Sequence, residues 1–323
     1  MKEDNAPENV VYRLYLAGGL DSLRLPWSAG LLILGLALAA RYSCLPPHPG
    51  VADWAGLPVT AVGALLVAVF ATRWLGSRQG LLVGIIVATS LWACGGPGPT
   101  AADRLGSIAV WAALATFAVA NVPGRLTPDG RLRASACFWI ALATTIVLAG
   151  APGACYVLVA CGLYLLASQD SKGLRFLLNP WGLAFIAVVV AGCLVAVRLG
   201  GLSASPALAG CAWAIPPAAT EPSSLTTLAG WLLVAALPWA PLGLLAAVVG
   251  IREGYYFTAF WRLLVCWALG PAVLLAAGLY RQTPHLTVLL PPVAVLSAIG
   301  LDDVLCWLRR RAALRRTCAR ATP

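Results

Sequence analysis

The residue best suited to chemistry in this sequence is Asp103, a carboxylate that stands between two long apolar runs. It follows a segment rich in glycine and proline, residues 95–100, which lets a backbone approach a ligand closely. The apolar run from Leu105 predicts a helix directly after it, and a helix N-terminus favours an ionised carboxylate. Such a carboxylate can hold a divalent metal or orient an acceptor group. An aspartate before a helix is also a preferred cap, and the two interpretations are compatible.

A second carboxylate, Asp53, is the only acid in the polar segment from Ser43 to Gly56. If this segment and that of Asp103 lie on the same side of a membrane, the two carboxylates can converge as metal ligand and base. The alternative interpretation of Asp53 is an exposed loop acid.

The elements that must position these carboxylates are membrane-spanning helices. Apolar residues make up 60% of the chain and charged residues 11%, whereas a soluble domain carries about 25% charged residues. A helix needs roughly 20 apolar residues to cross the hydrocarbon core, so the sequence predicts about ten crossings. The predicted fold class is all-α, a polytopic transmembrane helical bundle. The predicted spans are 26–42, 57–75, 79–94, 105–121, 135–150, 153–168, 180–199, 225–250, 258–280 and 284–301.

The basic residues predict how these spans are oriented. With the N-terminus in the cytosol, seventeen of the 22 Lys and Arg residues fall on the cytosolic side and four on the outer side. Both termini are therefore predicted to be cytosolic, with Asp53 and Asp103 on the outer side. The basic residues lie in short loops and at the C-terminal end, where membrane topology and anionic lipid head groups favour them. The net charge of +10 therefore does not indicate a nucleic-acid partner.

The chain divides into three predicted regions. Residues 1–25 form a cytosolic or interfacial segment, residues 26–308 the transmembrane domain, and residues 309–323 a basic cytosolic tail. Asp302 and Asp303, followed by the arginines of the tail, predict a cytosolic amphipathic end held to anionic lipid and not a site.

The cysteines can be considered as ligands of a metal and as partners in a disulfide. Ten cysteines without a C-x-x-C pair, beside two histidines, argue against a zinc site. A disulfide remains a possibility among the cysteines predicted near the outer face, which are Cys44, Cys94 and Cys211.

Pro238 and Pro241 predict a kinked or broken helix in the 225–250 run, since each removes a backbone hydrogen bond.

Several short motifs follow one another in an order that points to a known family. They are Gly56-Leu57-Pro58-Val59, Leu75-Gly76-Ser77-Arg78, Ala88-Thr89-Ser90, Asp103, Leu237-Pro238-Trp239, Arg281-Gln282-Thr283-Pro284-His285 and Leu289-Leu290-Pro291-Pro292. In this order and spacing they resemble the lipid-dependent membrane glycosyltransferases, the family of bacterial aminoarabinose transferases and protein O-mannosyltransferases. The resemblance runs from about residue 55 to residue 309 and identifies the chain as a short, divergent member.

The resemblance implies an activity. A member of this family transfers a sugar from a polyprenyl-phosphate donor to a lipid, glycan or protein acceptor at the outer face of the plasma (inner) membrane. The implied partners are therefore the polyprenyl-phosphate sugar and membrane lipid. Asp103 and Asp53 become the implied catalytic residues and the candidate ligands of a Mg or Mn ion.

The resemblance also implies binding residues at the outer face. Candidates for the donor phosphate are Arg281, Arg104 and His285, because positive charge stabilises a departing phosphate. Glu221 is the candidate on the acceptor side. The alternative interpretation of the two arginines is that they extend to the membrane interface, and that of His285 is a polar cap at a helix start.

Two departures from the family pattern leave other functions open. The family's first outer loop is long and carries an acid central to catalysis, whereas here it has about fourteen residues with Asp53 alone. The family's basic K-G-P helix start is replaced by Ala151-Pro152-Gly153. The alternative function is a catalytically inactive relative acting as a lipid-binding or assembly membrane protein. A transporter is a third hypothesis, although the span centres lack the ionisable residues that transporters use.

Overall fold

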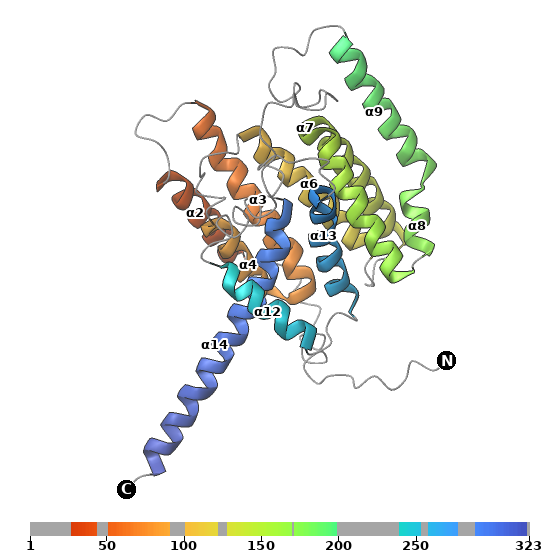
Figure 1. Cartoon of the computed structure of the whole chain (residues 1–323). Coiled ribbons are helices and arrows are strands. Elements are labelled where there is room, and N and C mark those ends of the chain that lie inside the picture. Colours follow the sequence, from red (N-terminus) through yellow and green to blue (C-terminus); the bar gives the residue numbers. More distant parts are fainter. Residues whose placement is uncertain are drawn as a thin grey trace, which may run out of the picture.

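The structure is a computed structural model that describes residues 27–43, 51–90, 101–121, 128–169, 171–198, 239–252, 258–276 and 288–321. Every regular element in these ranges is helical, so the all-α prediction is confirmed for them. Figure 1 shows the helices gathered into a bundle from which one end of α14 projects. The elements are α2 (Trp27–Ser43), α3 (Val51–Leu75), α4 (Ser77–Thr89), α6 (Ala101–Asn121), α7 (Pro128–Ser168), α8 (Ser171–Leu177), α9 (Pro180–Arg198), α12 (Ala240–Arg252), α13 (Ala259–Ala276) and α14 (Leu290–Ala321).

The described helices include five segments that are long and apolar enough to cross a membrane. They are Pro58–Leu75, Arg104–Asn121, Asp129–Ser168, Gly173–Val195 and Leu290–Leu308. Shorter apolar helices lie in α2, α4, α12 and α13. A multi-pass helical bundle therefore fits the chain, while the number of ten spans and the cytosolic placement of both termini remain predictions.

The α7 segment contains a sharp reversal at Gly150. This glycine has φ 66° and ψ −163°, a backbone conformation that glycine adopts without steric cost. In a straight helix, residues eight apart lie about 12 Å apart along the axis. A Cβ placed on Gly153 would instead lie 2.9 Å from Cγ2 of Thr145, so the two halves of α7 fold back on each other. The two spans predicted for residues 135–150 and 153–168, with almost no loop between them, match this hairpin.

Helices α3 and α4 form a second hairpin around Gly76. Gly76 has φ 90° and ψ 167°, which suits only glycine, and it separates the last residue of α3 from the first of α4. The two helices then run antiparallel in close contact, because a Cβ on Gly80 would lie 2.9 Å from the carbonyl oxygen of Ala68. The short glycine turn predicted from residues 75–78 is thus present.

Helices α3 and α6 run parallel, and this defines the two ends of the bundle. Thr60 of α3 is hydrogen-bonded to Arg104 of α6, and further along both helices a Cβ on Gly63 would lie 3.1 Å from Ile108. The end where α3 and α6 begin is called the acidic end below, and the end where they finish is called the basic end. The acidic end corresponds to the predicted outer face.

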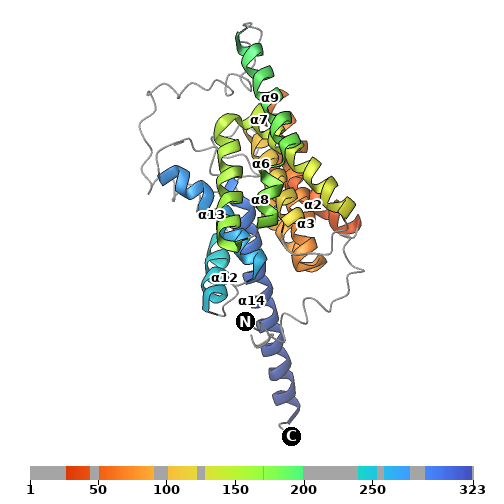
Figure 2. The same cartoon turned by 90° about the vertical axis from the view of Figure 1, so that its right-hand side faces the viewer.

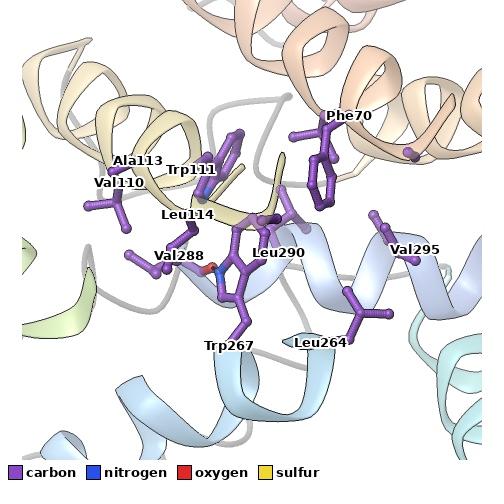
Figure 3. Close-up of a cluster of buried hydrophobic side chains, with 14 of the residues drawn as sticks. Phe70, Val110, Trp111, Ala113, Leu114, Leu264, Trp267, Val288, Leu290 and Val295 are labelled. Atoms are coloured by element: carbon purple, nitrogen blue, oxygen red, sulfur yellow. Dashed lines mark hydrogen bonds between the residues drawn. The ribbon is translucent and has the colours of Figure 1, made fainter. Parts of the chain in front are cut away.

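The core between these helices is built from aromatic and aliphatic side chains. Figure 3 shows Trp111 of α6, Phe70 of α3 and Trp267 of α13 pointing into one buried cluster. Phe70 and Trp267 meet edge to face with ring centroids 5.9 Å apart, a favourable arrangement of aromatic rings. The indole nitrogen of Trp267 donates a hydrogen bond of 3.1 Å to the carbonyl oxygen of Val288, so this buried polar atom is satisfied.

Helix α9 lies on the outside of the bundle, as Figure 2 shows, while α14 projects at the other end. Only 6% of the segment Gly173–Val195 is buried, as expected of an apolar helix that faces lipid. It approaches the bundle closely at Gly182, where a Cβ would overlap the indole ring of Trp139.

Several helix boundaries differ from those predicted. Helix α3 begins at Val51 and not at Leu57, with Pro58 inside it, because the segment before Leu57 is compatible with a helix although it is less apolar. Helix α14 continues to Ala321, whereas hydropathy predicts its end at residue 301. Pro241 lies in the first turn of α12, where its missing N–H has no intrahelical acceptor to lose. Pro238 lies outside the described residues.

Candidate functional site

The two predicted catalytic carboxylates belong to helix starts at the same end of the bundle. Asp53 is the third residue of α3 and Asp103 is the third residue of α6. Because α3 and α6 run parallel, both first turns lie at the acidic end. The free backbone N–H groups of a first turn favour a carboxylate and keep it ionised.

This placement corrects two details of the sequence prediction. Asp103 is not a cap before the helix, since α6 begins two residues earlier at Ala101. Two alanines, which have the highest helix propensity, extend the helix in the N-terminal direction. Asp53 likewise lies in a helix and not in a loop. Both residues therefore have helical backbones, which are more rigid supports than loops.

Arg104 brings positive charge to the same end. Its side chain is only 1% exposed, and its Nη1 donates a hydrogen bond of 3.2 Å to Oγ1 of Thr60 across the α3–α6 contact. Burying a guanidinium is costly unless it is hydrogen-bonded, so this bond offsets part of the cost. The alternative interpretation, in which Arg104 extends to the membrane interface, does not fit this burial, because the side chain is directed into the helix contact. Its role toward a donor phosphate remains a prediction.

The hydrogen bond between Thr60 and Arg104 gives a reference point from which the separation of Asp53 and Asp103 along the bundle axis can be estimated. Thr60 is level with Arg104, and Asp53 precedes Thr60 by seven residues, which is roughly 10 Å of helix at 1.5 Å per residue. Asp103 immediately precedes Arg104 and is therefore nearly level with it. Asp53 lies about two helical turns further out than Asp103. Within the described ranges, no group of three or more His, Cys, Asp or Glu residues is arranged to hold a metal ion.

The remaining predicted site residues lie outside the described residues. They are Glu221, Arg281 and His285. The same is true of the three cysteines considered for a disulfide, Cys44, Cys94 and Cys211. Their assigned roles stay predictions.

Two of the sequence motifs meet in space. The indole Nε1 of Trp239 donates a hydrogen bond of 3.0 Å to Oγ1 of Thr89, which joins the motif at residues 237–239 to that at residues 88–90. Ser297 of α14 donates a hydrogen bond of 2.9 Å to the carbonyl oxygen of Trp239. These contacts hold the start of α12 against the end of α4 and against α14. The order of the motifs does not reveal this contact, and the sequence interpretation does not single out Ser297.

A charged cluster at the basic end was also missed. The guanidinium of Arg78 lies 2.5 Å from Oδ1 of Asp302, and Nε2 of Gln79 donates a hydrogen bond of 3.1 Å to Oδ2. Asp302 is buried in this contact, whereas Asp303 is exposed. The signal is the helical spacing, because Asp302 follows the buried Val295 and Ala298 at intervals of seven and four residues.

Comparison with known proteins supports the fold. No protein-family model and no curated protein matches the sequence. The structure is similar to the crystal structure of ArnT from Cupriavidus metallidurans in the apo state, with a TM-score of 0.60 and 17% identity over 82% of this chain and 48% of ArnT. It is equally similar to the crystal structure of the same protein bound to undecaprenyl phosphate, with a TM-score of 0.60 and 15% identity over 84% and 49% of the two chains.

The likeness shows that this chain shares its fold with ArnT, a membrane polyprenyl-phosphate-dependent glycosyltransferase. The resemblance predicted from the sequence motifs is thereby confirmed at the level of the fold. The chain spans about half the length of ArnT.

Proposed function

We propose that this protein is an integral membrane glycosyltransferase of the plasma membrane. It transfers a sugar from a polyprenyl-phosphate donor to a lipid, glycan or protein acceptor at the acidic end of the bundle. The observation that carries the proposal is the fold shared with ArnT, whose structure has been determined with undecaprenyl phosphate bound. The arrangement of the acidic end adds support, since Asp53 and Asp103 lie in the first turns of parallel helices there and the guanidinium of Arg104 is buried between these helices.

In this proposal the carboxylates have separate roles. Asp103 lies level with Arg104 and acts on the reacting acceptor group as general base or through a bound divalent ion. Asp53 lies about two turns further out and orients the sugar or contributes to the ion's coordination. Arg104, with Arg281 and His285, supplies positive charge for the phosphate that leaves. Glu221 faces the acceptor.

The second candidate is a catalytically inactive relative that binds lipid or assembles with other membrane proteins. Two observations favour it. The guanidinium of Arg104 is buried in the contact of α3 with α6, where it stabilises helix packing. The helical start of α3 at Val51 also shortens the first outer segment beyond what the sequence predicts.

Sugar transfer in a membrane preparation with the native lipid donor tests the proposal. Asp103→Asn and Asp53→Asn are compared with Asp129→Asn, an exposed acid in the first turn of α7 at the basic end. The expected result is loss of transfer in the first two variants and full activity in the third. Full activity in all three variants overturns the catalytic assignment and favours the inactive relative.

A further inference from the structure

Helix α14 continues well beyond its apolar part. The part apolar enough to cross a membrane ends at Leu308, whereas the helix ends at Ala321. Figures 1 and 2 both show this end of α14 leaving the bundle. The thirteen residues from 309 to 321 add about 20 Å of helix at 1.5 Å per residue.

These thirteen residues, called the basic helix end below, carry a large part of the positive charge of the protein. They contain six arginines, and no acid follows Asp303 in the chain. The segment therefore carries more than half of the net charge of +10. Thirteen residues of helix in water gain little stability from their own backbone hydrogen bonds, so a partner that binds this end of α14 also stabilises it.

The junction between the apolar part and the basic helix end has the chemistry of a membrane interface. Trp307 is 53% exposed, and the guanidinium of Arg311 lies over its ring, 4.7 Å from the centroid. Tryptophan and arginine are favoured at the level of lipid head groups. One turn earlier, Asp302 is held by Arg78 and Gln79 of α4, which fixes α14 at this level.

We propose that the basic helix end docks on anionic phospholipid head groups of the membrane that α14 crosses. Its tether to a membrane-spanning helix keeps it beside a high local concentration of lipid phosphates. The surface potential of an anionic leaflet decays over a Debye length of about 8 Å. Arg309, Arg310 and Arg311 lie within the first turn beyond the apolar part and therefore contribute most, whereas Arg315, Arg316 and Arg320 lie further out. The inference rests on α14 crossing the membrane and is independent of glycosyl transfer.

Hydrogen exchange of the full-length protein in lipid nanodiscs tests the proposal. Backbone amides of residues 309–321 should exchange at least tenfold more slowly in discs with about 30% phosphatidylglycerol than in pure phosphatidylcholine discs. The difference should disappear in about 0.5 M salt. Equal exchange in the two kinds of disc overturns the proposal. Protection by polyuridylate in phosphatidylcholine discs, without protection by phosphatidylglycerol, also overturns it and indicates a nucleic-acid partner.

Two triple variants of equal charge locate the contact. R309Q/R310Q/R311Q should remove most of the protection, since each arginine near the surface changes affinity about fivefold and three change it about 100-fold. R315Q/R316Q/R320Q should retain most of it. An equal loss in both variants overturns the placement of the head groups beside Arg309, Arg310 and Arg311. Unchanged exchange in α3 and α6 serves as the control for folding.

Discussion

The two ends of the bundle use their polar residues differently. At the basic end, Asp302 is paired with Arg78 and Gln79, which precede it by more than 220 residues, so the charges join helices that are distant in sequence. At the acidic end, Asp53 and Asp103 stand in the first turns of parallel helices, and the buried Arg104 directly follows Asp103. The first arrangement stabilises the fold, while the second presents carboxylates on rigid supports. Substitutions at the two ends should therefore separate activity from stability.

The largest expected effect concerns two aspartates, one at each end. Asp103→Asn should lower sugar transfer about 10²–10⁴-fold, as expected for the loss of a general base, with little change in Tm. Asp302→Asn should leave the rate of transfer unchanged and lower the Tm. Transfer assays and thermal unfolding of the purified variants measure both quantities. If the rate of transfer and the Tm both fell in each of the two variants, the distinction between the two ends would be contradicted.

The second prediction concerns how tightly helices pack toward the basic end. A Cβ on Gly80 would overlap the hydroxyl of Thr72 and lie 2.9 Å from the carbonyl oxygen of Ala68, so Gly80→Ala must displace backbone. We expect a loss of about 1–3 kcal/mol in the free energy of unfolding. Gly35→Ala is the matched control, because nothing lies within 4 Å of a Cβ there. Reversible unfolding in mixed micelles measures both, and equal stability of the two variants contradicts the prediction.

The third prediction concerns the coupling between Arg78 and Asp302. The arginine side chain is 49% exposed, so solvent screens the pair and the coupling free energy should be only about 0.5–1 kcal/mol. A double-mutant cycle of Arg78→Gln and Asp302→Asn measures it through the free energy of unfolding. A coupling free energy of zero would mean that Arg78 does not stabilise the buried carboxylate of Asp302 and that, of the two partners, only Gln79 does.

The smallest expected effect concerns the contact between α12 and α4. Trp239→Phe removes the hydrogen bond to Thr89 and should cost about 0.6 kcal/mol, the average for hydrogen bonds between membrane helices. Thr89→Val removes the same bond from the other side. The two variants should therefore be non-additive when combined, and full additivity in unfolding free energy indicates that the contact does not contribute.

The sequence alone predicts those features that depend on local composition. Apolar runs locate the helices, and the glycine at residue 150 between two such runs predicts the hairpin in α7 that the backbone angles confirm. The carboxylates of the candidate site are also found from the sequence, because few acids interrupt the apolar runs. That Asp53 and Asp103 share one end follows from the parallel course of α3 and α6, which the alternation of spans predicts.

The features missed from the sequence depend on contacts between distant segments. The hydrogen bond from Gln79 to Asp302 joins residues 223 positions apart, and no local pattern specifies which helices pack together. The helical start of α3 at Val51 was missed because hydropathy locates the apolar part of a helix and not its polar turns. For the same reason the continuation of α14 to Ala321 exceeds the predicted span.

The hairpin at Gly150 has a consequence for how the protein enters a membrane during synthesis. The chain reverses at Gly150, and neither this residue nor Ala151, Pro152 and Gly153, which follow it, carries a charge. Transfer of this turn across the bilayer therefore avoids the cost of about 2.5–3.5 kcal/mol that each charged residue adds at the centre of the bilayer. The two halves of α7 can leave the translocon together as one unit. In the predicted topology, Arg131 and Arg133 in the first turns of α7 stay on the cytosolic side and set the direction of insertion.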